Sequence, residues 1–509
     1  MIYRNKIISV LLVICLVAGL MVTGLMQKDT TQEEKSIFDN RYKESLILWY
    51  ADEDLSDYLN CQAVAYLEEY NIKVTPVLVS GLDYLESINQ ASVATNEIPD
   101  IYITNNGNLE KSYLSGLASE VIDKNNFLNE KNFPKAALNA ITYQGKKVAY
   151  PLYFEAAFFL FNRTYMENFA KDTIEAENDA AEGEEAQEVL SQNISADEVA
   201  MGDNSSEITV SDQDIEKKVE TVIPTTIDDI LNFADEYDAP ENVESVFKWD
   251  VSDIFYNYFM VGNYISVGGD CGDDENNIDI YNRNSLTCLN VYQDLNQFFS
   301  IEPKEVTYDS IIKEFVEGKT VFTIATTDAF GKIEEAKEKG EFQYDYGVAA
   351  LPDVSSELKS RGLSVTGCSV INGYSQKKEA ANDFCVYLSE EGSKTLYSRT
   401  NKVSAHLGVV YENPEIENAM LEYEKSVPIP KMVSAESFWV QLEIAFTKIW
   451  TGSDTQETLQ NMTKGCGYPV DEELVKKISD EYAAAAAAEA AVEAAAEAEA
   501  AAAAEEQPE

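Results

Sequence analysis

Histidine and positive charge are scarce in this sequence. It holds one histidine, His406, and 38 lysines and arginines against 90 aspartates and glutamates, a formal net charge of −52. One imidazole nearly excludes a zinc site built on several histidines and leaves a single candidate for a Ser-His-Asp arrangement. A loop or surface position is the simpler interpretation of His406. So negative a surface repels phosphate backbones, which makes nucleic acid a poor partner.

Cysteine motifs are missing as well. The seven cysteines form no CxxC pair, so the sequence has neither a zinc knuckle nor a thioredoxin-type redox motif. Cys61 and Cys385 lie in helical patterns that predict small buried side chains. Cys271 and Cys288 could form a disulfide in an oxidising compartment, and this alternative stays open. We expect no metal, no cofactor and no catalytic residue.

The first 26 residues are, by contrast, strongly apolar. Arg4 and Lys6 precede a run of about 20 apolar residues, which is typical of an export signal or a membrane-spanning anchor. Cys15 follows Ile14 instead of the small residue that a lipoprotein signal needs. We therefore favour an uncleaved anchor, with cleavage after Gly24 as the alternative. Basic residues before the span and acids after it place the bulk of the chain outside the cell, behind a polar tether at 27–43.

The chain from 44 to 104 alternates between strand and helix patterns. Buried strands are predicted by apolar runs at 46–50, 72–79 and 98–104, and helices by the spacing of apolar residues at 55–70 and 84–93. This order favours a parallel sheet covered by helices, whose ligands bind outside the carboxyl ends of the strands. The loops 51–54 and 105–108 are expected at that edge of the sheet.

The stretch 144–163 carries an acid in an unusual place. A turn at Gly145 precedes a short strand, Pro151 and a strongly apolar run that predicts a buried strand. Glu155 interrupts this run, and a lone carboxylate is expensive to bury without partners. We therefore expect Glu155 at a turn, at the edge of a lobe or in a polar site.

This stretch resembles the first crossing between the lobes of the maltose-binding family, the extracellular solute-binding proteins that serve sugar ABC importers. Further landmarks follow in the family's order: Pro99-Asp100-Ile101, Ser115-Gly116-Leu117, Phe-x-x-Gly-Lys at 315–319, Tyr-Gly-x-x-x-Leu-Pro at 346–352 and Glu391-Gly392. The resemblance covers most of residues 44–470. It implies an α/β fold of two lobes joined by a hinge, the periplasmic-binding-protein type II fold with mixed, mostly parallel sheets.

The resemblance and the composition together predict how the chain is divided. The predicted lobes are 44–153 with 353–402, and 154–352 with 403–470. Residues 171–222 are rich in acids and poor in aromatics, so we expect a disordered insertion in a surface loop of the second lobe. Residues 471–509 form an alanine- and glutamate-rich tail of high helix propensity.

The resemblance also implies which residues face a ligand. Glu155 occupies a cleft-facing position, and Trp439 begins a cleft-facing helix. Where the family often sets a tryptophan over the ligand, this sequence has none, and Asp328 or Phe330 takes that place. Tyr258 and then Tyr256 match aromatic residues that stack on sugar rings, and core packing is an equal interpretation of Tyr258. The strand-end loops lack the lysine and the aromatic residue of maltose-type members, and by position they contribute Asp54, Asn105 and Asn106.

The family's role implies a monomeric protein that captures a carbohydrate or other small solute between two lobes and delivers it to ABC permease subunits in the membrane. A surface-anchored sensor or scaffold without transport is an alternative that the acidic insertion and the tail would suit. An extracellular glycoside hydrolase needs only two carboxylates and is a further alternative. No pair of acids in an aromatic strand-end context supports it, so we expect a binding protein and no enzyme.

Overall fold

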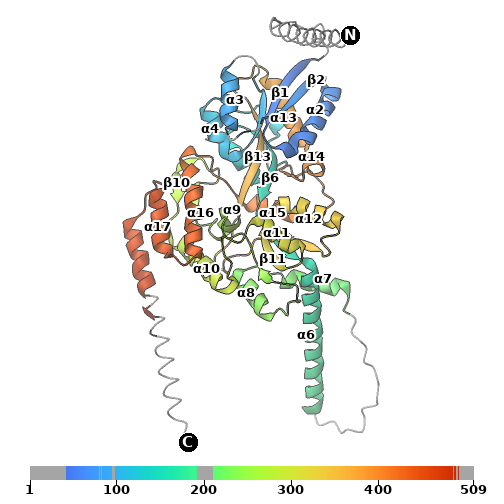
Figure 1. Cartoon of the computed structure of the whole chain (residues 1–509), viewed down its shortest axis with the longest axis vertical. Coiled ribbons are helices and arrows are strands. Elements are labelled where there is room, and N and C mark those ends of the chain that lie inside the picture. Colours follow the sequence, from blue (N-terminus) through green and yellow to red (C-terminus); the bar gives the residue numbers. More distant parts are fainter. Residues whose placement is uncertain are drawn as a thin grey trace, which may run out of the picture.

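The computed structural model describes residues 42–79, 81, 83–94, 98–191, 210–484, 487–488 and 491. The chain forms two lobes, each built on a mixed β-sheet with helices around it, one above the other in Figure 1. The α/β class, the two lobes and the mixed sheets confirm the fold predicted from the sequence.

The first lobe contains a seven-stranded sheet. Its strands follow the order β14-β6-β13-β3-β1-β2, and β15 pairs with β13 outside this path. The strands are β1 (Glu44–Tyr50), β2 (Ile72–Leu78), β3 (Ile101–Asn105), β6 (Tyr150–Ala156), β13 (Leu363–Ile371), β14 (Val403–Ser404) and β15 (Val427–Pro428). The other elements are η2 (Glu53–Leu55), α2 (Ser56–Tyr70), α3 (Tyr84–Val93), η3 (Asn106–Asn108), α4 (Leu109–Leu114), η4 (Lys124–Asn126), α5 (Lys135–Ala140), the hairpin of β4 (Thr142–Tyr143) and β5 (Lys146–Lys147), α13 (Lys378–Glu390) and α14 (Ser393–Thr400).

The second lobe contains a four-stranded sheet in the order β12-β7-β11-β8. Its strands are β7 (Phe158–Asn162), β8 (Ser245–Phe247), β11 (Thr320–Ala325) and β12 (Tyr346–Ala349), beside the hairpin of β9 (Ser266–Gly268) and β10 (Asp274–Asp279). Its helices are α6 (Arg163–Ser191), α7 (Asp212–Val222), α8 (Ile227–Glu236), α9 (Ile254–Asn257), η5 (Tyr258–Met260), α10 (Arg283–Phe299), α11 (Tyr308–Val316), α12 (Asp328–Lys339), η6 (Val433–Ala435), α16 (Glu436–Trp450) and α17 (Thr455–Gly465). Helix α15 (Glu415–Lys425) contacts both β6 and β12 and so lies between the lobes.

Strand β7 shows why the second sheet forms from a continuous apolar run. Phe158 stacks against Phe330 of α12 on one face, and Phe159 stacks against Phe322 of the neighbouring β11. All five residues of β7 are buried, because helices cover both faces of the sheet and no face needs polar residues.

Antiparallel pairing is more extensive than the predicted, mostly parallel sheets. Every antiparallel pair in the two large sheets involves β6, β7 or β13. The parallel pairs are β1–β2, β1–β3, β8–β11 and β13–β15. The physical reason is the repeated passage between lobes, since β6 leaves the first lobe where its neighbour β13 returns to it.

Three segments connect the lobes. Strand β6 continues through Ala157 into β7, residues 350–362 join β12 to β13, and residues 429–432 join β15 to η6 and α16. From the sequence, residues 403–470 are predicted to belong to the second lobe. The structure instead pairs β14 with β6 and β15 with β13, because both short strands complete hydrogen bonds of the first sheet.

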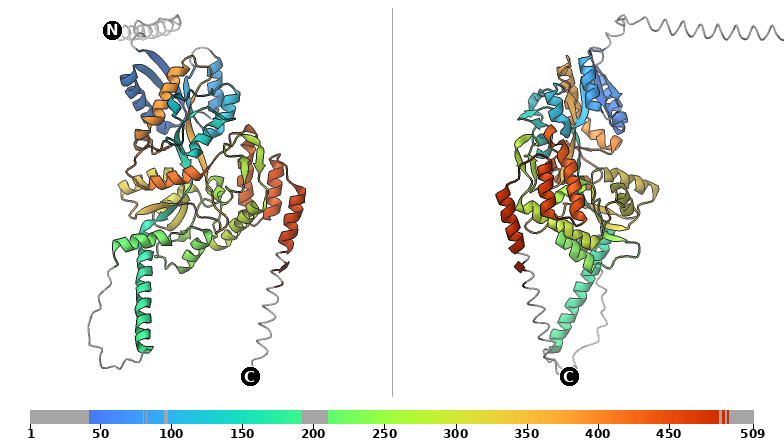
Figure 2. Two further views of the ribbon diagram at one scale, coloured as in Figure 1. Left: turned by 180° about the vertical axis from the view of Figure 1, so that it is seen from behind. Right: turned by 60° about the vertical axis from the view of Figure 1, so that its left-hand side comes forward.

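Both ends of the predicted disordered insertion are helical. Helix α6 projects from the second lobe as a long rod, and α7 packs against its base (Figures 1 and 2). Lys218 of α7 forms an ion pair with Glu177 of α6 at 2.6 Å, and Val219 is buried in the core of the second lobe. Residues 171–191 and 212–222 are thus helical, and the amphipathic α7 has an apolar face that composition alone conceals. Residues 192–209 lie outside the described residues.

The two ends of the chain are described only in part. The predicted signal or anchor at 1–26 and the tether up to residue 41 lie outside the described residues. In the part of the chain that is described, no helix is both long and apolar enough to cross a membrane. The C-terminal tail is helical from 472 to 484, with Ile478 buried and the Tyr482 hydroxyl accepting a hydrogen bond from Asn290 Nδ2 at 3.2 Å. Its first part therefore belongs to the core of the second lobe.

Cys271 and Cys288 do not form the disulfide that the sequence left open. Both are free thiols. Cys288 is buried in α10, while Cys271 lies half-buried in the turn between β9 and β10. Burial raises the pKa of both thiols, that of Cys288 to about 12, so neither has the character of a reactive thiolate.

Candidate ligand-binding site

Glu155 lies on β6 at the point where the chain leaves the first lobe. Its register partner on β13 is Val365, and Tyr153 lies two residues earlier on the same face of β6. The side chain is half-buried, and within the described residues its carboxylate makes neither a hydrogen bond nor an ion pair. Burial raises its pKa, Lys402 opposes this change, and the charges of Asp328 and Asp52 add to it. Glu155 is therefore a half-buried acid whose hydrogen-bonding capacity is unused within the described part of the chain.

The first lobe supplies an ion pair beside Glu155. Lys402, which directly precedes β14, binds the carboxylate of Asp52 with an Nζ–Oδ2 distance of 2.9 Å. The same Nζ lies 5.0 Å from the ring centroid of Tyr153. Asp52 also accepts a hydrogen bond at 3.1 Å from the main-chain N–H of Asp54, an exposed residue of η2. The pKa of Tyr153 is raised, first by burial and then by the charges of Asp52 and Glu155.

A glycine positions Tyr153 on the sheet. A Cβ atom at Gly367 of β13 would lie 2.3 Å from the Tyr153 ring, so the ring rests directly on the main chain of the neighbouring strand. Gly367 also pairs with Asn105 at the end of β3. Residues in register across a sheet project to the same face. Asn105, which is exposed, and Tyr153 therefore flank Gly367 along one row.

The second lobe contributes Asp328 at the start of α12. The Asp328 carboxylate accepts a hydrogen bond from the Tyr308 hydroxyl at 2.7 Å and forms an ion pair with Lys332 at 2.8 Å. The Tyr308 ring stacks on Tyr256 with centroids 4.5 Å apart. The hydroxyl of Thr327 donates to the main-chain carbonyl of Phe154 at 3.1 Å, which ties the start of α12 to β6. This contact brings Asp328 to the side of Glu155.

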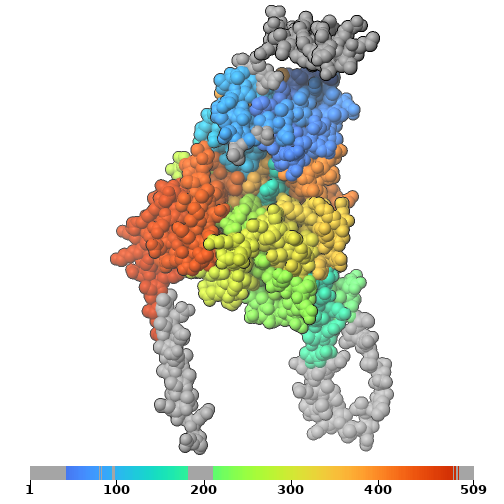
Figure 3. All heavy atoms as spheres, in the orientation of Figure 1, coloured from blue at the N-terminus to red at the C-terminus, as the bar shows by residue number. Residues whose placement is uncertain are grey.

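These residues form one polar group at the junction of the lobes, where β6 and β13 are labelled in Figure 1 and turquoise atoms show between the lobes in Figure 3. We call it the interlobe cluster: Asp52, Tyr153, Glu155, Tyr308, Asp328 and Lys402. Each of its aspartates already binds a lysine, while Glu155 has no such partner in the described part of the chain. Carboxylates accept hydrogen bonds from hydroxyl groups, ammonium groups donate them, and tyrosines offer an apolar face with a polar tip. The cluster is therefore suited to a small polar ligand rich in hydroxyl groups.

Asn106, Tyr258 and Trp439 have other surroundings. Asn106 is buried, its Nδ2 donates to the carbonyl of Ile429 at 2.9 Å, and its Oδ1 accepts from the N–H of Thr366 at 2.9 Å. Tyr258 is 2% exposed, and its hydroxyl donates to the carbonyl of Ile265 at 3.2 Å. Trp439 is half-buried and packs edge-on against Tyr258 at 5.6 Å. Their roles in ligand binding stay predictions, and the structure shows Asn106 and Tyr258 engaged in internal contacts.

The residues that the sequence did not single out are Asp52, Tyr153, Tyr308 and Lys402. Asp52 lies in the strand-end loop that was selected, but it is two residues before the selected Asp54. Lys402 and Tyr308 are distant in sequence from Glu155, and only the pairing of β14 with β6 and the position of α12 bring them near. Lys402 thus places a lysine beside the strand-end loop 51–54, through its ion pair with Asp52.

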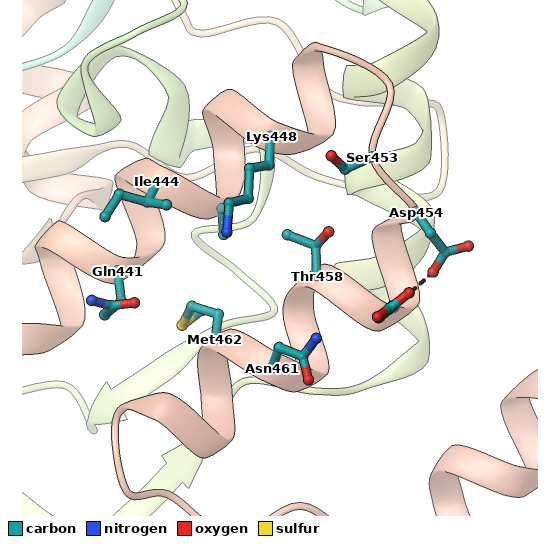
Figure 4. A pocket seen from close by; sticks show the side chains of 10 residues that line it. Gln441, Ile444, Lys448, Ser453, Asp454, Thr458, Asn461 and Met462 are labelled. Atoms are coloured by element: carbon teal, nitrogen blue, oxygen red, sulfur yellow. Dashed lines mark hydrogen bonds between the residues drawn. The ribbon is translucent and has the colours of Figure 1, made fainter.

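A separate cavity lies between α16 and α17 in the second lobe (Figure 4). It has a volume of about 530 Å³ and is lined by Ile444, Lys448, Asp454, Thr458 and Met462 among others. Asp454 caps α17 by accepting a hydrogen bond from the N–H of Glu457 at 2.7 Å. None of the predicted ligand-binding residues lines this cavity.

No family model and no curated protein matches the sequence, but solved structures match the fold. One is an extracellular solute-binding protein from Staphylococcus aureus in complex with maltose, with a TM-score of 0.63 and 19% identity over 83% of this chain and 96% of that chain. A cyclo/maltodextrin-binding protein complexed with maltotetraose has a TM-score of 0.63 and 17% identity over 83% and 96% of the two chains. The maltose-binding periplasmic protein MalE from Listeria monocytogenes, in complex with maltose, has a TM-score of 0.61 and 18% identity over 83% and 97%.

At these identities the similarity shows the fold alone. It is the fold of extracellular solute-binding proteins of the maltose-binding type, which confirms the resemblance drawn from the sequence. These three proteins are binding proteins by description.

Proposed function

We propose that this protein is the extracytoplasmic solute-binding component of an ABC importer, and that it captures a carbohydrate between its two lobes. The observation that carries the proposal is that the charge of Asp328 from the second lobe acts on Glu155 of the first, because Thr327 binds the start of α12 to β6. A ligand held there would contact both lobes at once, which couples its binding to the relative position of the lobes. The structures of the same fold that were solved with maltose or maltotetraose support a sugar as the ligand.

The ligand would be bound mainly through its hydroxyl groups. Glu155 would accept hydrogen bonds without losing an existing partner, and Lys402 would donate to a ring or hydroxyl oxygen while keeping its contact with Asp52. Asn105 and Asp54 would contribute from the exposed rim. The half-buried Trp439 would offer an apolar face to a sugar ring, while Tyr256 stacks on Tyr308 and supports it beside Asp328.

Lobe closure would be a hinge motion of the three connecting segments, at Ala157, at 350–362 and at 429–432. In the role that we propose, the N-terminal segment holds the protein at the outer face of the cell membrane, where it acts as a monomer and delivers the sugar to the permease subunits.

A thermal-shift screen of the full chain against mono- and oligosaccharides tests the proposal. A sugar at about 100 times its dissociation constant should add about 2.7 kcal/mol to the free energy of unfolding. Glu155→Gln and Asp328→Asn should each remove this shift, while Glu236→Gln, at an exposed position of α8, should keep it. A flat response to all sugars, or an undiminished shift in both cluster variants, would refute the interlobe cluster as a sugar site.

A further inference from the structure

The first lobe has a cavity of about 530 Å³ with an aromatic floor, and none of its lining residues belongs to the interlobe cluster. Its floor is formed by Tyr66, Tyr70, Phe127, Val386 and Tyr387, and we call it the tyrosine pocket. The Tyr66 ring lies 4.5 Å from that of Tyr70 and 4.9 Å from that of Tyr387, measured between centroids. Tyr70 is 43% exposed. The pocket therefore presents apolar ring surface to solvent, which a protein normally covers or uses.

The described chain begins at the rim of this pocket. Lys43 lines it, and the N–H of Lys43 donates to the carbonyl of Asn71 at 2.8 Å, which joins it to the turn after α2. The preceding residue, Tyr42, has its ring centroid 5.9 Å from the Nζ of Lys73 on β2. The tether thus reaches the first lobe directly beside the pocket.

The tether contains two apolar side chains that have no evident use in a polar linker. Between residues 27 and 41 only Ile37 and Phe38 are apolar, and they are adjacent. Phe38 is five residues from Lys43, and five residues span at most roughly 18 Å, enough to reach a pocket that Lys43 itself lines.

The acidic side chains at the rim of the tyrosine pocket are complementary to the tether segment that contains Phe38. Asp383 binds Lys124 at 2.7 Å and Glu391 binds Lys394 at 2.6 Å, so both acids have partners. Glu390 also lines the pocket and forms no ion pair within the described residues. Arg41, three residues after Phe38, can supply the missing cation.

We propose that Ile37 and Phe38 bind in the tyrosine pocket, so that the end of the tether is part of the first lobe. The link is intramolecular, and a short linker gives an effective concentration in the millimolar range, so a weak intrinsic affinity suffices. The spacer between the N-terminal apolar segment and the folded lobe then shortens to residues 27–36, and the first lobe takes a fixed orientation to that spacer.

Photo-crosslinking in the full chain, in membranes, tests this proposal. Phe38 is replaced by p-benzoylphenylalanine, and the crosslinked peptides are identified by mass spectrometry. We expect crosslinks within one chain to the floor of the pocket, on α2 and α13. The same probe at Gln32 is the matched control and should not reach the pocket. Absence of pocket crosslinks from position 38, or equal yields from both positions, would overturn the proposal.

Hydrogen exchange on the unlabelled protein gives a second, independent result. Amide exchange in α13 around Val386 should become faster in Phe38→Ser and equally in Tyr70→Ser. Tyr374→Ser is the control, since Tyr374 is 39% exposed in the same lobe and does not line the pocket. Crosslinks between two chains would assign the pocket to a second copy. Protection that depends on an added oligosaccharide and is unchanged in Phe38→Ser would assign it to a sugar. Either result contradicts the tether as occupant.

Discussion

The ammonium group of Lys431 donates a hydrogen bond at 3.0 Å to the main-chain carbonyl of Asn139, and so fastens the third connecting segment to α5 of the first lobe. The same group donates to the carbonyl of Cys271 in the β9–β10 turn of the second lobe. Lys431 is 1% exposed, and its contacts are carbonyl groups rather than a carboxylate. It therefore joins both lobes at a point separate from the interlobe cluster.

Lys431 should make stability depend on pH in the alkaline range. Burial lowers its pKa from 10.5 to about 8. Between these values the unfolded chain binds the proton and the folded chain does not, so stability rises with pH across this window. Relative to Lys431→Met, the wild type should gain up to about 3 kcal/mol between pH 8 and 10.5. Denaturant titrations of both proteins at several pH values measure the difference, and parallel pH profiles would contradict it.

Glu155→Gln should have opposite effects on stability and on sugar binding. Because burial raises the pKa of Glu155, the folded protein binds its proton more tightly than the unfolded chain, and the ionised side chain costs stability above the ordinary carboxyl range. The variant should therefore be more stable than the wild type at pH 7, with the gain fading as the pH falls through the acid range. Unfolding curves of the variant and the wild type, measured at pH 7 and at a pH in the acid range, test this difference. A variant that is less stable than the wild type at pH 7 would argue against it.

Gly367→Ala should disturb the site through Tyr153. The added Cβ would lie 2.3 Å from the tyrosine ring, so the ring must move, at a cost of about 1–3 kcal/mol. In a Tyr153→Ala background the same change should cost little. Gly465→Ala, where the new Cβ meets nothing within 4 Å, is the matched control. Equal destabilisation in both backgrounds would show that Tyr153 is not the obstacle.

Asn106→Ala should lower the free energy of unfolding. The substitution leaves the carbonyl of Ile429 and the N–H of Thr366 without their partners, at a cost of about 1–3 kcal/mol each. Asn60→Ala serves as control, since Asn60 is exposed on α2 and bonds only its own helix in the described structure. The free energies of unfolding of the wild type, Asn106→Ala and Asn60→Ala measure this loss of stability. An Asn106 variant of normal stability but weakened sugar binding would restore the role predicted from its position.

The sequence predicts the fold better than the site. The two lobes can be predicted because their signals, such as the apolar run with Glu155 and the order of the landmarks, are carried by residues adjacent in the sequence. The site depends on contacts between distant segments, such as Lys402 with Asp52, which no local pattern reveals. Asn106 and Tyr258 show the converse, since a suitable position in a loop or short helix does not tell whether the side chain turns outward or is used internally.

The position of β13 in the middle of the first sheet affects how the chain folds. It pairs with β3 on one side and β6 on the other, although both strands precede it by more than two hundred residues. During synthesis or export from the N-terminus, β3 and β6 each present an open edge until residue 371 has emerged, and such edges invite pairing with other chains. Distant pairing of this kind also slows folding. We therefore expect refolding from denaturant to be slow and sensitive to protein concentration.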